Sequence, residues 1–249
     1  MKQGSILFLL VYATTVIAGT GHHISPGESL EKAFVQMNPG DTLHLAPGTY
    51  RGAITIPPAI HVRGKNPYTT EIVGTNRDPV LTMNRNSSIS GSTITGGLNG
   101  ILVHHEGVEI SHCIIENNRL SGIISIHHLP HVHNTAFVNN GRHGIKGEDI
   151  GTAPPAQNLS FIRNTQGAMD IAGEATPTVS TSLFFATGMV ATPGTVEVER
   201  SVASPAPDTS FSAGIRAEQL RITSLRRRRR DYQSSSHPEY GITFSPPEE

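Results

Sequence analysis

The apolar residues of this chain recur in short runs that are separated by glycine and asparagine. Gly100, Gly122 and Gly144 are each followed directly by isoleucine, and they follow one another at a constant interval. A fixed period of about 22 residues is typical of a stacked array of similar units. The apolar runs are too short for helices and lack a 3.6-residue periodicity. We therefore expect each run to be a β-strand that hydrogen-bonds to its copy one turn later.

Asparagine follows the same period and lies shortly after an apolar position in each copy. Glycine and asparagine both tolerate positive φ angles and so suit the corners of such an array. Stacked side-chain amides can also hydrogen-bond to one another along the stack. We expect such a structural ladder from Asn117, Asn118, Asn139, Asn140 and Asn164.

Two segments resemble known proteins. Residues 107–123, GVEISHCIIENNRLSGI, resemble one coil of the right-handed parallel β-helix, or pectin-lyase-like, superfamily. Residues 29–56, SLEKAFVQMNPGDTLHLAPGTYRGAITI, resemble its N-terminal cap and first strand. The resemblance implies an all-β fold, a single right-handed parallel β-helix with about 22 residues per coil. Leucine-rich repeats share this length, but they need a dense leucine ladder that is absent here.

A short helix is expected over residues 29–36. Ser29 can cap its first turn, and Leu30, Ala33, Phe34 and Met37 fall on one face. In the superfamily that the chain resembles, such a helix plugs the open N-terminal end of the solenoid. This agrees with the need to cover unpaired strand edges at the end of a stack.

Three segments are expected along the chain. Residues 1–21 have a positive residue, an apolar core and small residues before a cleavage position, which predicts a secretory signal peptide. Residues 22–202 form the predicted β-helix. Residues 203–249 are rich in proline, serine and arginine, which favours a mostly disordered tail. We expect a secreted or periplasmic protein, a monomer with no membrane span after signal cleavage.

Charge and cysteine content narrow the possible partners. The net charge is −1, and the run of five arginines at 226–230 contains no aromatic residue, so a nucleic-acid partner is not expected. Cys113 is the single cysteine, so no internal disulfide can form. It lies between Ile110 and Ile115, where the coil pattern points inward, and we expect a buried apolar side chain rather than a nucleophile.

One column of polar residues is not required by the coil itself. His105, His127 and Asp149 lie at the same offset after successive repeat glycines. Residues one turn apart stack about 4.8 Å from one another, so these three are expected to form a line along the stack. Binding residues are predicted beside them: His104, Glu106, His128 and Glu148. Eight of the thirteen histidines fall between residues 104 and 143.

Three interpretations of this column stay open. The first is a catalytic groove, in which a histidine and a carboxylate on adjacent turns act as general base and orienting group. The second is a metal site, because two imidazoles and a carboxylate suit a divalent transition metal. The third is that the histidines fill polar corners of the coil and have no function.

A second candidate is the cationic strand formed by Arg142, His143 and Lys146. The resemblance implies catalysis by lysine or arginine acting on a uronate, as in polysaccharide lyases of this fold, often with calcium held by carboxylates. The paired aspartates of the related hydrolases and a carboxylate-rich calcium run are absent from the sequence, so no catalytic set transfers directly. Residues 151–157 are expected to bulge from the coil and to wall a groove over residues 127–157.

These observations predict a secreted β-helix protein that binds or processes a polysaccharide, with an acidic polysaccharide as the preferred ligand. If it is an enzyme, a polysaccharide lyase or a related carbohydrate-active enzyme is expected. A divalent cation is the one cofactor considered. The alternatives are a non-catalytic structural or surface solenoid and a periplasmic metal-binding β-helix protein.

Overall fold

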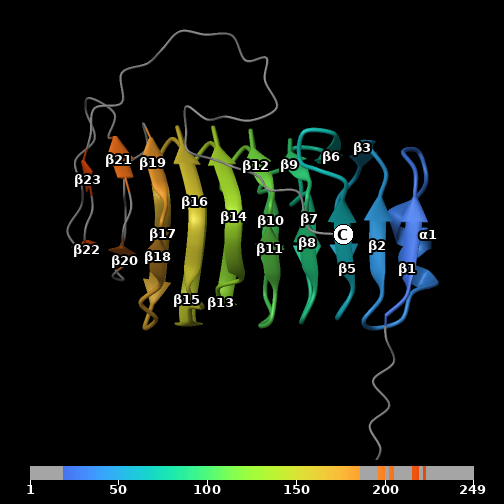
Figure 1. Cartoon of the computed structure of the whole chain (residues 1–249), viewed down its shortest axis with the longest axis horizontal. Coiled ribbons are helices and arrows are strands. Elements are labelled where there is room, and N and C mark those ends of the chain that lie inside the picture. Colours follow the sequence, from blue (N-terminus) through green and yellow to red (C-terminus); the bar gives the residue numbers. More distant parts are fainter. Residues whose placement is uncertain (1–18, 186–195, 200–201, 205–214, 219–220, 223–249) are drawn as a thin grey trace, which may run out of the picture.

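The computed structural model describes residues 19–185, 196–199, 202–204, 215–218 and 221–222. In these residues one helix and 23 strands are formed, and every strand pair is parallel. The strands stack side by side into an elongated solenoid (Figure 1). Their pairings divide it into three faces. The predicted all-β parallel β-helix is confirmed. The predicted signal peptide lies almost wholly outside the described residues.

The first face contains the strand that opens each coil. It consists of β1 (Gly21–Ile24), β2 (Thr42–Leu45), β5 (His61–Gly64), β8 (Ser88–Ser90), β11 (Glu109–Ser111), the start of β14 (His131–Val138), the start of β16 (Ala156–Ile162), β18 (Thr178–Ser180), β20 (Val196–Glu199) and β22 (Ile215–Glu218).

The second face continues the same sheet around a corner. It consists of β3 (Gly48–Arg51), β6 (Thr70–Val73), β9 (Thr93–Thr95), β12 (Ile114–Glu116), the ends of β14 and β16, β19 (Leu183–Phe185), β21 (Val202–Ser204) and β23 (Arg221–Ile222).

The third face is a separate six-stranded sheet. It consists of β4 (Ile54–Ile56), β7 (Leu81–Met83), β10 (Ile101–Val103), β13 (Ile123–His128), β15 (His143–Thr152) and β17 (Gly167–Gly173). Ile101 pairs with Ile123, and Ile123 pairs with Ile145, so the period of the sequence is the register of this sheet.

The core is a set of side-chain columns inside the coils. On the second face the inward column changes from isoleucine to phenylalanine, and the rings of Phe137, Phe161 and Phe184 stack with centroids 5.0 and 5.2 Å apart. Cys113 is fully buried, and burial raises the pKa of its thiol to about 12, as expected for a structural cysteine.

The repeat glycines are required for close packing, not for a positive φ. Positive φ angles occur instead at other corner residues, among them His112, Asn134 and Asn158. A Cβ on Gly122 would lie 2.7 Å from the carbonyl oxygen of Gly144 and 2.9 Å from the ring of Phe137. The part of our prediction that explained these glycines by backbone conformation is therefore wrong.

The helix α1 (Leu30–Val35) lies beside β1 at the N-terminal end of the row (Figure 1). Ser29 caps it by accepting a hydrogen bond from the Lys32 backbone N–H, and Leu30 and Phe34 are buried in the core. The predicted capping helix is confirmed. Among the described residues, no helix has the length and hydropathy needed to cross a bilayer.

Two segments differ from the expected outline. The predicted loop over residues 151–157 is shorter, because β15 runs to Thr152 and β16 starts at Ala156. A register shift against β13, where Ile126 pairs with Glu148 but His128 pairs with Thr152, takes up two extra residues inside β15 instead. Parts of the predicted tail lie in β21, β22 and β23, and the rest of that tail lies outside the described residues, so the boundary at residue 202 stays a prediction.

Candidate functional site

The predicted column of His105, His127 and Asp149 is formed in part. His127 Nδ1 lies 3.0 Å from Asp149 Oδ2, and both side chains are largely exposed. They meet because β13 and β15 are paired in the regular repeat register just before this corner. Both residues have positive φ angles, which marks them as corner residues. His105 lies after the end of β10 and is exposed. The catalytic and metal roles of these three residues stay predictions.

The predicted cationic strand is β15. Lys146 Nζ forms an ion pair with Glu148 Oε1 at 2.6 Å on its outer side. Asp170 lies opposite Lys146 in the paired strand β17. Arg142 is exposed just before the strand, whereas His143 is buried.

His143 is the most unusual group in this part of the structure. Its Nδ1 is buried and makes no hydrogen bond in the described chain, and it lies 3.9 Å from Asp170 Oδ2. Burial lowers the pKa of His143, the Asp170 carboxylate opposes this shift, and Lys146 and Arg142 add to it. A neutral imidazole beside a lysine and a carboxylate can accept a proton at neutral pH.

A pocket of about 500 Å³ lies at the corner between the third and first faces. Its wall includes Glu106 and His128, which were predicted as binding residues, together with Glu109, His131 and residues 152–154. The short connection between β15 and β16 therefore does wall a hollow beside residues 127–157, as predicted. His128 Nδ1 lies 3.1 Å from Thr152 Oγ1 across this corner. His104 is exposed in the β10–β11 connection and does not line the pocket.

A larger groove of about 810 Å³ lies on the first three coils and was missed by the sequence analysis. It is lined by His23, His44, Arg63, Lys65 and neighbouring apolar and polar residues, with no carboxylate in its wall. The register pairs His23 with His44 and His44 with Arg63. The two imidazole rings stack with centroids 4.7 Å apart.

The sequence pattern that marks this groove does not follow the repeat period, because the first coils differ in length. His23, His44 and Arg63 are register partners on successive coils, but their two sequence intervals are unequal and both are shorter than the main period. A search for the constant repeat spacing therefore does not align them. Burial, His23 and Arg63 together lower the pKa of His44, in that order of importance, so His44 is neutral at neutral pH. At that pH Arg63 and Lys65 give the groove wall a positive formal charge.

Solved structures with a similar fold include two pectin methylesterases and a pectate lyase. A pectin methylesterase from carrot is similar with a TM-score of 0.59 and 11% identity over 86% of this chain and 85% of that one. The pectin methylesterase PemA from Erwinia chrysanthemi has a TM-score of 0.56 and 8% identity, covering 93% of this chain and 99% of its own. The pectate lyase Pel9A has a TM-score of 0.50 and 12% identity over 84% and 78%. At these identities the likeness concerns the fold alone.

No curated protein matches the sequence closely enough to count as a relative. A family model described as a right handed beta helix region matches residues 71–201, which is more than half of the chain. Together with the parallel three-faced stack, this match shows that the protein belongs to the right-handed β-helix family.

Proposed function

We propose that this protein binds an acidic polysaccharide in the groove formed by the first three coils. The observation that carries the proposal is the lining of that groove, which contains Arg63 and Lys65 and no carboxylate. None of the ion pairs among the described residues involves Arg63 or Lys65. Carboxylate groups of a polymer can therefore pair with them without displacing a partner.

The shape of the surface favours a linear ligand. On the outer side of the first face each coil adds one polar side chain in register, about 4.8 Å from the next. In the first four coils these are His23, His44, Arg63 and Ser90. A polymer lying along the solenoid axis can hydrogen-bond to successive members of this column. The pectin-acting enzymes that share the fold support a polysaccharide as the polymer.

The test is binding of the purified chain to polygalacturonate and alginate, measured by calorimetry, with a neutral glucan as a second ligand. The double variant Arg63→Ala/Lys65→Ala removes both groove cations. The control Lys32→Ala/Arg77→Ala removes two exposed basic side chains outside the groove and has the same change in net charge. We expect at least tenfold weaker binding for the groove variant and no change for the control. Equal losses in both would show that net charge alone attracts the polymer.

Processing of the bound polymer is a second proposal, favoured by the buried neutral His143 beside Lys146 and Asp170. In a lyase reaction a base removes the proton on the carbon next to the uronate carboxylate. The glycosidic oxygen leaves with a proton, and a carbon–carbon double bond remains in the product. We expect new ultraviolet absorbance from these unsaturated ends, and its loss in His143→Ala.

If a broad panel of polyuronates gives no such absorbance, lyase action is excluded. If binding is also absent, the remaining interpretations are a structural solenoid and a metal-binding β-helix protein, both without a carbohydrate ligand.

A further inference from the structure

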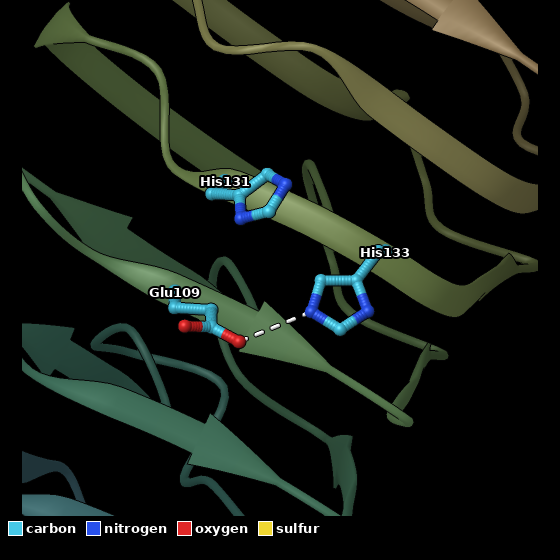
Figure 2. Close-up of side chains that lie close together, drawn as sticks. All are labelled: Glu109, His131 and His133. Atoms are coloured by element: carbon cyan, nitrogen blue, oxygen red, sulfur yellow. Dashed lines mark hydrogen bonds and ion pairs between the residues drawn. The ribbon is translucent and has the colours of Figure 1, made fainter.

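Three potential metal ligands converge on the outer side of the first face (Figure 2). Glu109 lies on β11, and His131 and His133 lie on the neighbouring strand β14. One ligand atom from each side chain lies within 4.8 Å of the other two, and no other group of three or more such side chains in the described chain meets this condition. The site is distinct from the predicted set of His105, His127 and Asp149.

The local sequence explains why these side chains share one side of the sheet. Alternate residues of a strand point to opposite faces, so the motif His131-Val132-His133 directs both imidazoles outward and Val132 into the core. The parallel register places Glu109 beside His131 and Ser111 beside His133. Serine is small, which leaves the space between the two strands open to the imidazole of His133. That imidazole approaches Glu109 diagonally.

The distances suit a tetrahedral ion after small rotations. His133 Nε2 lies 3.0 Å from Glu109 Oε1, and the rings of His131 and His133 have centroids 5.2 Å apart. Zinc binds histidine nitrogen and carboxylate oxygen at about 2.0–2.2 Å, which separates the ligand atoms of a tetrahedral site by roughly 3.3–3.5 Å. The Glu109 side chain is 50% exposed, so it can rotate without disturbing the core.

A neighbouring amide can hold His133 in the required orientation. Asn134 Nδ2 lies 3.2 Å from His133 Nδ1 and 3.1 Å from His112 Nε2. Turning the Asn134 amide over, so that Oδ1 takes the place of Nδ2, would let it accept a hydrogen bond from His133 Nδ1–H. The Asn158 amide, which now donates to Asn134 Oδ1, would turn over with it. A metal-bound histidine commonly makes this type of hydrogen bond through its second ring nitrogen.

The site also leaves room for an exogenous ligand. Glu109 and His131 form part of the wall of the pocket of about 500 Å³, which opens beside them. Two histidines and a glutamate with an open fourth position form the ligand set of catalytic zinc sites rather than closed structural ones. By contrast, His127 and Asp149 supply only two side chains and are already paired with each other.

We propose that Glu109, His131 and His133 bind one divalent transition-metal ion of the zinc class. The site does not depend on polysaccharide binding, because it lies on β11 and β14 and the cationic groove lies on the first three coils.

The experiment is titration of the untagged, chelator-treated chain with Zn²⁺ alone by calorimetry, and with Co²⁺ alone by visible absorption. The variants are Glu109→Gln, His131→Ala and His133→Ala, and the matched control is His127→Ala. We expect one ion per chain, d–d absorption bands typical of tetrahedral Co²⁺, and at least tenfold weaker Zn²⁺ binding in each of the three variants. His127→Ala should bind Zn²⁺ as tightly as the unmodified chain.

None of the four substituted side chains belongs to the core, and circular dichroism checks that each variant is folded. The proposal is overturned if the unmodified chain binds no Zn²⁺ at millimolar concentration. It is also overturned if the His131→Ala/His133→Ala double variant keeps the full affinity. Loss of binding in His127→Ala alone would assign the ion to the His127–Asp149 pair and would overturn it too.

Discussion

Asn118 donates a side-chain hydrogen bond to Asn140 over 3.1 Å, from Nδ2 to Oδ1, across one turn of the solenoid. Asn140 repeats the contact with Asn164 at 2.9 Å. The Asn140 amide also hydrogen-bonds to the backbone: its Nδ2 donates to the Ile115 carbonyl, and its Oδ1 accepts from the Asn118 N–H. All three side chains are buried, so the ladder satisfies polar groups that water does not reach.

We therefore expect Asn140→Asp to destabilise the fold. It replaces the Nδ2 donor by an acceptor, so the Ile115 carbonyl and Asn164 Oδ1 each lose one hydrogen bond, and it places a carboxyl group in the core. The expected loss in free energy of unfolding is about 2 kcal/mol or more, since each lost hydrogen bond contributes about 0.5–1.5 kcal/mol and the buried carboxyl group adds to the cost. Denaturant unfolding measures it. Asn139→Asp is the control, because Asn139 is exposed and has a positive φ that aspartate tolerates.

The asparagine ladder shows how much of the structure can be predicted from the sequence alone. The repeat period predicted the position of the ladder correctly. The five asparagines expected to form it, however, belong to two separate groups in the structure. Asn117 and Asn139 have positive φ angles at the corner, and Asn118, Asn140 and Asn164 form the buried ladder. The fold followed from residues that repeat, because stacking depends on repetition. Many polar contacts did not follow, because the coils near the N-terminus differ in length and break the constant spacing.

Contacts that depend on strand register or on unequal coil length were also missed at the candidate sites. His131 and His133 were visible as part of a histidine-rich segment, but Glu109 is connected to them only by the register of β11 and β14. Asp170 was not singled out because its coil is longer than the preceding one, so the regular period does not align it with Lys146. His127 and Asp149 met as expected, because their coil has the regular length.

The repeat glycines give a second prediction. In Gly122→Ala the new methyl group would lie 2.7 Å from the Gly144 carbonyl oxygen and 2.9 Å from the Phe137 ring. Backbone cannot move aside cheaply in a stacked sheet, so we expect a loss of about 1–3 kcal/mol in the free energy of unfolding. Gly27→Ala is a useful comparison. Its Cβ meets nothing within 4 Å, but its φ of 94° is strained for alanine, so any loss there comes from backbone conformation alone.

The phenylalanine stack gives a third prediction. Phe161 is fully buried between Phe137 and Phe184. Truncation in Phe161→Ala removes contacts with both neighbours and leaves a cavity in a narrow coil, at an expected cost of about 3–5 kcal/mol. Phe161→Leu keeps most of the volume and is expected to cost less. Thermal unfolding of the three proteins should rank the unmodified chain first, the leucine variant second and the alanine variant last; any other order would contradict the packing argument.

Stability is expected to fall at acidic pH in two separate windows. Burial lowers the pKa of His143, His112 and His44 below the ordinary value of 6.5. The unfolded chain therefore binds protons that the folded chain does not, and stability declines as pH falls below about 6.5. The pKa of Asp41 is also lowered, but here the charged form is the stabilised one, because it accepts hydrogen bonds from the backbone of Asn38 and Thr20 and from the Thr20 side chain. Its contribution is present above the ordinary pKa of 3.8 and is lost as pH falls below it.

Two variants separate these windows in urea unfolding measured from pH 8 to pH 3. His143→Asn should reduce the decline between about pH 6.5 and pH 5 and leave the lower window unchanged. Asp41→Asn should lower stability at neutral pH and flatten the curve below pH 4. If His143→Asn left the upper window unchanged, the buried imidazole would not be the source of that decline.

The groove on the first three coils predicts a distinct pH response of binding. His44 is neutral at neutral pH and adds a positive charge beside Arg63 only when it is protonated. An acidic polymer that stays ionised favours the protonated form, so its affinity should rise as pH falls from 7 toward 5, while uronate carboxylates remain charged. High salt should weaken binding at both pH values, because the pairs in this open groove are screened. In His44→Gln the rise with acidity should be smaller and the salt dependence should remain. A response to acidity that is identical in His44→Gln and the unmodified chain would show that His44 is not the titrating group. Loss of the salt dependence in Arg63→Ala/Lys65→Ala would still assign the polymer carboxylates to Arg63 and Lys65.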